Sequence, residues 1–189
     1  PIARGLAGPG LLAQVLVAKY CDHQPLYRQS AIYARHGVTL SRSTLADWVA
    51  GSSQLLRPLV QALHRYVMGG NKVHADDTPV PVLAPGRGKT RTGRLWTYVR
   101  DDRSAASEQP AAVWFGYSPD RKGGHPQRHL KDFQGVVQAD GYAGFNALYD
   151  SGRVKEAACW AHVRRKFYDI AEQQSSPEAL HVLGRIAQL

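Results

Sequence analysis

The chain has 189 residues, of which 43% are hydrophobic and 21% are charged, and this balance suits a globular core and excludes a disordered chain. Lysine and arginine number 24 against 15 acidic residues, so the formal net charge is +9 and the pI is about 9.8. The excess predicts nucleic acid or another polyanion as the partner, the alternative being a merely soluble basic protein.

Residues 11–67 are predicted to be all helical, because their apolar residues recur at helical spacing. Gly37 is placed to end one helix, since glycine readily adopts the left-handed conformation found at helix C-termini. The stretch Thr44-Leu45-Ala46-Asp47 has the form of a capping box and predicts that the next helix opens at Thr44. Pro58 should kink or split that helix, because proline lacks the backbone donor and clashes one turn back.

The helices around residues 25–49 could form a helix-turn-helix that reads a groove of DNA. Arg42 and Ser43 lie near the start of its second helix and are the predicted DNA-binding residues of this part. Short helical hairpins are also common packing units, so plain packing is the alternative. We expect residues 1–70 to be a helical, helix-turn-helix-like DNA-binding module.

After Gly69-Gly70 the apolar pattern changes to that of strands. The predicted strands cover 72–83, 95–101, 111–117, 135–139 and 154–160, and the predicted helices cover 126–133, 142–149 and the residues from His162 onward. This order is typical of an α+β arrangement, a mixed sheet with helices packed on it. We therefore expect a second domain, an α/β core over residues 71–189.

The segment Pro85-Gly86-Arg87-Gly88-Lys89-Thr90 is rich in glycine but is not a phosphate-binding loop. That motif needs a glycine where this sequence has Leu83, and it must open a helix, whereas a predicted strand follows here. The better interpretation is a basic hairpin turn. Its cationic residues form a candidate DNA-binding strip, namely Arg87, Lys89, Arg91 and Arg94.

The two cysteines, Cys21 and Cys159, are too few for a disulfide framework, so we expect free thiols in a reducing compartment. Cys159 and His162 have a spacing that zinc would accept, but only Cys21 and His23 could complete the four ligands of a structural site. A buried thiol followed by a partly exposed histidine is the favoured interpretation. The most apolar run, residues 11–17, is too short to cross a membrane, so we expect a soluble, cytoplasmic protein with no membrane partner.

Asp76 and Asp140 are the most informative pair, because each follows an apolar strand-like run. If the two strands are neighbours, the carboxylates can converge on divalent cations, which require hard oxygen ligands. Two such cations about 3.5–4 Å apart can activate an attacking oxygen and stabilise a leaving oxygen in phosphodiester chemistry. Taken singly, either aspartate is more often a turn or cap residue.

These residues resemble a known family. Asp76-Asp77-Thr78 is similar to the D-x-T motif in the first strand of polynucleotidyl transferases with a ribonuclease H-like fold, and Gln138-Ala139-Asp140-Gly141-Tyr142 resembles their second aspartate motif. More specifically, nearly the whole chain resembles bacterial transposases of the insertion-sequence-66 family. The matching stretches include "HADDTPVPVLAPGRGKTRTGRLWTYVRDDR", "FGYSPDRKGGHP", "VVQADGYAGFNALY" and "ACWAHVRRKFYDI".

The resemblance implies a DDE transposase, in which two aspartates and a glutamate bind Mg²⁺ or Mn²⁺ at a two-metal site for DNA strand cleavage and strand transfer. Asp76 and Asp140 match the two aspartates as catalytic and metal-binding residues. Asp77 stands where many relatives carry glutamate, and we interpret it as adjacent to the metal site. The third carboxylate is expected beyond Leu189, with Glu156, Glu172 or Glu178 as resident alternatives.

The resemblance also implies that the chain is a fragment of the central and catalytic parts, with the family's cysteine-rich zinc segment upstream of Pro1. Transposon ends and target DNA are the implied partners, and a homo-oligomer is the implied active form, associated with the bacterial nucleoid when bound to DNA. A second basic strip follows the last predicted strand and is expected to contact phosphates, namely His162, Arg164, Arg165 and Lys166. The alternatives are a solvated helix face for this strip, and for the protein an inactive DNA-binding remnant or a ribonuclease H-like nuclease.

Overall fold

The structure is a computed structural model that describes residue 2 and residues 5–188. The chain divides into two compact units, Pro1–Ala62 and Leu63–Leu189. The helix α3 (Arg42–Met68) crosses from the first unit into the second and continues through Pro58 without interruption. Of the two effects predicted for Pro58, a kink or a split, the split is not observed, because one missing backbone donor does not outweigh the hydrogen bonds of a 27-residue helix.

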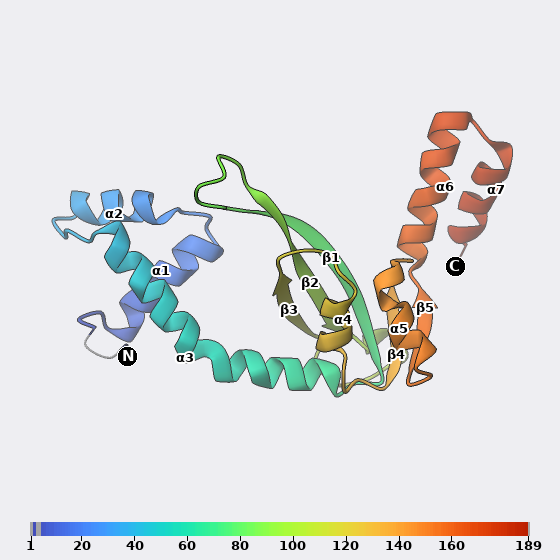
Figure 1. Ribbon diagram of the computed structural model, residues 1–189, viewed down its shortest axis with the longest axis horizontal. Coiled ribbons are helices and arrows are strands. Elements are labelled where there is room, and N and C mark those ends of the chain that lie inside the picture. The colour runs from blue at the N-terminus through green and yellow to red at the C-terminus, as the bar shows by residue number, and fades with distance from the viewer. Residues whose placement is uncertain (1, 3–4, 189) are drawn as a thin grey trace. The chain divides into compact units, whose positions relative to one another are not determined.

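The first unit is built from α1 (Pro9–Tyr20), α2 (Leu26–Arg35) and most of α3 (Figure 1). Its buried residues are mainly aliphatic and include Leu12, Val15 and Leu45. Gln29 is buried among them and donates from Nε2 to the carbonyl of Val15 at 3.3 Å. The prediction that this half is all helical is confirmed.

The connection between α2 and α3 shows how side chains and glycine end and start helices. Gly37 has φ of +78°, and the N–H groups of Gly37 and Val38 donate to the carbonyls of Ala34 and Tyr33, which is a Schellman closure of α2. The Oγ of Ser41 accepts the N–H of Thr44 at 3.0 Å. The cap is thus Ser41, and the predicted start at Thr44 is wrong by three residues.

The second unit contains a five-stranded sheet with strand order β3-β2-β1-β4-β5. Its strands are β1 (Lys72–Val82), β2 (Arg91–Arg100), β3 (Ala112–Ser118), β4 (Gly135–Ala139) and β5 (Val154–Ala158). Strands β1, β2 and β3 are antiparallel neighbours, whereas β1–β4 and β4–β5 are parallel pairs. The predicted mixed sheet is confirmed, and β2 begins four residues earlier than predicted because the hairpin pairing continues to Val82 and Arg91.

Short helices cover one face of this sheet (Figure 1). They are α4 (Gly124–His129), the 3-10 turn η2 (Ala143–Phe145) and α5 (Asn146–Asp150), while a further 3-10 turn, η1 (Arg103–Ala105), lies between β2 and β3. The core joins Trp96 and Tyr98 of β2 to Phe133, Phe145 and Leu148 from the covering segments. Alternate residues of β1, Val73 and Ala75, point into the same core.

Strand β5 leads into a helical hairpin of α6 (Trp160–Gln174) and α7 (Pro177–Ile186). Ser175, with φ of +50°, ends α6, and the Oγ of Ser176 accepts the N–H of Ala179 to start α7. No helix within the described part of the chain is both long and apolar enough to span a membrane.

Candidate metal and nucleic-acid site

The two aspartates singled out by the sequence lie on neighbouring strands. Residues 72–74 of β1 pair with residues 136–138 of β4 in parallel register, and continuing this register places Asp76 opposite Asp140. Strand β4 ends at Ala139, so Asp140 is the first residue beyond it. The predicted adjacency of the strands is confirmed.

Asp76 and Asp77 lie on opposite faces of β1, because successive side chains of a strand alternate. Asp76 is exposed, and its Oδ1 accepts the N–H of Asp77 at 2.8 Å. Asp77 follows the buried series of Val73 and Ala75, and its side chain is only 2% exposed. The exposed carboxylate of the pair is therefore the one that a cation or a DNA strand can reach.

Asp77 is neutralised by two arginines from different elements. Arg94 of β2 donates from Nη1 to Oδ2 of Asp77 at 3.0 Å. Arg121, in the loop between β3 and α4, donates from Nε to Oδ1 at 2.9 Å, and its Nη2 lies 2.8 Å from the same oxygen. With both oxygens engaged, Asp77 serves as a buried counter-charge.

Arg121 also connects Asp77 to Asp140. Its Nη2 donates to Oδ2 of Asp140 at 3.1 Å, and the other oxygen, Oδ1, accepts the N–H of Tyr142 at 3.2 Å. The guanidinium group stacks on the ring of Tyr142 at 4.2 Å from the ring centroid, and the Tyr142 hydroxyl donates to the carbonyl of Arg121. The Asp140 side chain, 26% exposed, is thus held in one orientation at the end of β4.

Burial and the charges of this cluster shift the pKa values of Arg121 and Tyr149. Burial opposes the charge of Arg121, but the hydrogen bond with Asp77 and attraction to Asp77 and Asp140 raise its pKa above the ordinary value. Burial, followed by the negative charges of Glu156 and Asp140, raises the pKa of Tyr149 to about 12. Arg121 is therefore charged and Tyr149 neutral at physiological pH.

The chemistry of Asp76 and Asp140 fits a hard divalent cation, which takes carboxylate oxygens and retains several waters. The described residues contain no group of three or more His, Cys, Asp or Glu side chains placed to hold a metal, so a metal site at these two aspartates stays a prediction. Glu156 pairs with Val137 on β5, and Glu178 bonds to Ser176 at the start of α7. Neither of these resident glutamates joins the two aspartates.

The hairpin turn predicted at residues 85–90 is confirmed, since β1 and β2 pair up to Val82 and Arg91. Arg87, Lys89 and Arg91 are exposed along it. Arg94 differs from the other cations of this predicted strip, because it is half-buried and paired with Asp77. The periodicity of the hairpin could not reveal that ion pair, which joins residues on two paired strands.

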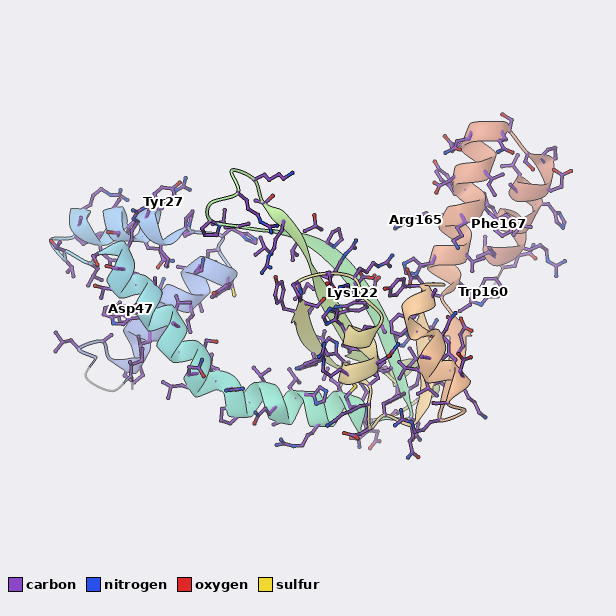
Figure 2. The ribbon with its side chains drawn as sticks, viewed as in Figure 1. Tyr27, Asp47, Lys122, Trp160, Arg165 and Phe167 are labelled. Atoms are coloured by element: carbon purple, nitrogen blue, oxygen red, sulfur yellow. The ribbon has the colours of Figure 1, made fainter. Side chains whose placement is uncertain are left out.

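The second predicted strip lies on α6, where Arg164, Arg165 and Lys166 are exposed. Figure 2 shows Arg165 and Phe167 on this helix and Trp160 at the end that follows β5. His162 differs from its neighbours, because it is half-buried and its Nδ1 is enclosed without a hydrogen-bond partner among the described residues. Its predicted role in contacting DNA stays a prediction, and it is the least accessible member of the strip.

Arg42 and Ser43 lie exposed in the first turn of α3, within the first unit. The cysteines, Cys21 and Cys159, are both free thiols, the first exposed and the second half-buried at the start of α6. Arg121 was not identified as a site residue from the sequence. It lies 44 residues beyond Asp77, so no local spacing connects the two.

Comparison with known proteins gives a consistent result. The family described as "Transposase IS66 family" matches residues 4–189. Similar curated proteins come from Sinorhizobium fredii (strain NBRC 101917 / NGR234): uncharacterized protein y4hP is 41% identical over 92% of this chain, y4qI is 42% identical over 89%, and y4jD is 37% identical over 98%. The matched regions are 32%, 33% and 37% of those proteins, so the chain spans about a third of their length.

Proposed function

Because this chain belongs to the Transposase IS66 family, we propose that it carries two of the metal-binding carboxylates of a DDE transposase, Asp76 and Asp140. The observation that supports the proposal is the parallel register of β1 and β4, which would bring these aspartates opposite each other if it continues past residues 74 and 138. The mixed sheet that bears them supports a ribonuclease H-like core. The whole protein would cleave and join DNA strands during transposition of an insertion sequence.

In this proposal Asp76 and Asp140 hold Mg²⁺ or Mn²⁺ through carboxylate oxygens. When bound, such cations lower the pKa of water and stabilise the charge on the leaving oxygen of a phosphodiester. Asp140 is pre-oriented by Arg121 and the N–H of Tyr142, so little freedom is lost when it binds a ligand. Asp77 stays paired with Arg94 and Arg121 and supplies no oxygen ligand to the metal.

The exposed cations would bind the DNA backbone. Arg87, Lys89 and Arg91 on the hairpin, and Arg164, Arg165 and Lys166 on α6, can each neutralise phosphates without reading sequence. Arg42 and Ser43 would contact DNA from the helical unit, in the manner of a helix-turn-helix. The active complex is proposed to be a homo-oligomer on transposon ends and target DNA.

A second candidate is a DNA-binding protein without catalysis. It would hold if no further carboxylate completes the site, because Asp76 and Asp140 gather no third carboxylate among the described residues and two aspartates alone leave a cation under-coordinated. The same assay separates the two candidates.

The test is strand cleavage by the complete native protein on DNA that carries the element ends, with Mg²⁺ or Mn²⁺. Asp76→Asn and Asp140→Asn should each reduce cleavage at least about a hundredfold, because each removes a charged metal ligand. The matched control is Asp169→Asn, an exposed aspartate on α6, which should retain wild-type cleavage. Cleavage by either site variant at the wild-type rate would reject the assignment, and DNA binding without cleavage by the wild type would favour the second candidate.

A further inference from the structure

We propose that Arg121 is a positioning residue, which fixes the Asp140 carboxylate by anchoring it to the buried Asp77. The purpose of this positioning, metal binding by Asp140, rests on the proposed function. The contacts of Arg121 with Asp77 and Asp140 do not depend on it. These contacts also assign a role to Asp77, the second acid of the Asp76-Asp77 pair, as the anchor of the arginine.

The anchor is firm because Asp77 is almost completely buried and doubly paired. Its side chain is 2% exposed, and Arg94 and Arg121 approach its two oxygens at 3.0 and 2.8 Å. A buried carboxylate is costly unless it is fully hydrogen-bonded, so Asp77 holds both arginines strongly. The position of the Arg121 guanidinium is therefore set from within the sheet.

The orientation of the guanidinium plane is set by Tyr142. The centroid of its ring lies 4.2 Å from the guanidinium carbon, and its hydroxyl donates a hydrogen bond to the Arg121 carbonyl. Because the guanidinium donors diverge within one plane, a guanidinium stacked on Tyr142 and bonded to Asp77 also has a fixed direction of Nη2. That atom meets Oδ2 of Asp140 at 3.1 Å.

Asp140 then has one donor on each oxygen, Arg121 on Oδ2 and the Tyr142 N–H on Oδ1. Each carboxylate oxygen has further lone pairs, so a cation can still bind. Lysine at position 121 would keep the positive charge but not the planar fork, so it could not hold Asp77 and Asp140 in the same way. Arg121→Lys therefore separates geometry from charge.

The first measurement needs no metal. Amide hydrogen exchange is followed at Tyr142, whose N–H donates to Asp140, and at Cys159, whose N–H donates to the Ala139 carbonyl at 3.1 Å. In Arg121→Lys the Tyr142 amide should exchange at least about tenfold faster, because its acceptor is no longer held. The Cys159 amide should keep its rate, since the end of β4 is otherwise intact.

The second measurement is calorimetric titration of the same chain with Mn²⁺, where Arg121→Lys should weaken binding about tenfold. Lys122→Gln is the matched control, because Lys122 is the exposed neighbour of Arg121 and its only ion pair among the described residues is with Asp120, at 3.7 Å. It should match the wild type in both measurements. Figure 2 labels Lys122 among the side chains around the sheet.

A second variant guards against misfolding. Tyr142→Leu removes the ring under the guanidinium but leaves the Arg121–Asp77 pair, and the amide at position 142 should again exchange faster. Unchanged exchange at position 142 in the two variants would overturn the proposal, as would equal acceleration at positions 142 and 159, which indicates a merely structural role. If the variants show faster exchange at position 142 alone but the wild-type chain binds no Mn²⁺, the positioning role of Arg121 is retained and the metal site is rejected.

Discussion

His129 is a histidine that the fold keeps neutral. The hydroxyl of Tyr98 forms a hydrogen bond with its Nδ1 at 3.0 Å, and burial raises the pKa of Tyr98, so the tyrosine remains protonated. The rings of Trp96 and Trp114 enclose the imidazole at centroid distances of 6.3 and 5.3 Å. Burial, followed by the nearby charges of His125, Arg128 and His64, lowers the pKa of His129 to about 4.

This lowered pKa predicts acid sensitivity in a defined window. Above pH 6.5 the residue is neutral in the folded and the unfolded chain, so it does not affect the free energy of unfolding. Between pH 6.5 and about 4 only the unfolded chain takes up the proton, so the free energy of unfolding should fall as the pH falls. The expected loss is on the order of 1–3 kcal/mol, measured by urea denaturation at pH 7 and pH 4.

His129→Gln keeps an acceptor for Tyr98 but cannot titrate, so it should flatten this pH dependence. The exposed His181→Gln in α7 is the control and should keep the wild-type slope. An unchanged slope in His129→Gln would mean that other groups cause the acid sensitivity.

At the scale of single elements, β4 depends on a glycine at its first position. Gly135 has φ of +137°, and a Cβ there would lie 2.2 Å from the carbonyl oxygen of Asn71. The next residue, Val136, donates its N–H to that same carbonyl at 2.8 Å. The close approach of the two backbones starts the parallel pairing of β1 and β4.

Gly135→Ala should therefore destabilise the protein by more than about 2 kcal/mol, because it combines a backbone clash with an unfavourable φ. It should also weaken Mn²⁺ binding, since the register that aligns Asp76 and Asp140 is disturbed. Gly141→Ala is the matched control, because no atom lies within 4 Å of a Cβ built there and Gly141 has no positive φ. Equal stability of the two variants in thermal unfolding would refute the packing argument.

Element positions were the most predictable part of the fold. The bounds of β4 agree with the predicted run at residues 135–139, because a short apolar strand between two glycines has clear signals on both sides. The start of α3 was missed because Ser41 and Thr44 are both good capping residues and only the backbone path selects between them. The pairing at Arg91 was missed because a long hairpin continues through polar residues.

At the scale of the whole molecule, the net charge of +9 is concentrated in part on exposed strips. We predict that the isolated chain binds duplex DNA weakly and that its affinity falls steeply with salt. Replacing Arg164 and Arg165 by alanine should reduce the slope of log affinity against log salt by about one to two, because each phosphate contact contributes about 0.9. Fluorescence anisotropy at several salt concentrations measures this slope.

Arg103→Ala is the control for this prediction, because Arg103 is equally cationic but already bound to Asp101 at 2.7 Å. It should leave the slope unchanged. Asp140→Ala should not weaken DNA binding, since it removes a negative charge. Salt-independent affinity of the wild type would contradict the electrostatic account.

The candidate site was only partly predictable from the sequence. Asp140 follows an apolar run and lies directly after β4, a place that could be predicted from the sequence, whereas Asp76 lies within β1, which continues to Val82. Arg121 and Arg94 reach Asp77 from a loop and from a paired strand, and such contacts depend on the tertiary fold. The sequence marks the carboxylates, whereas folding selects which of the many arginines neutralise Asp77.

The parallel pairing of β1 with β4 also has a consequence for synthesis on the ribosome. Roughly 60 residues separate the paired segments, which takes about 3–12 s to translate at 5–20 residues per second. Once Arg91–Arg100 has been translated, β1 can pair with β2 on one edge, but its other edge is bare until β4 is made, and bare edges invite pairing with other chains. Nascent chains are therefore exposed to mispairing until β4 emerges, and Asp76 is translated seconds before its partner exists.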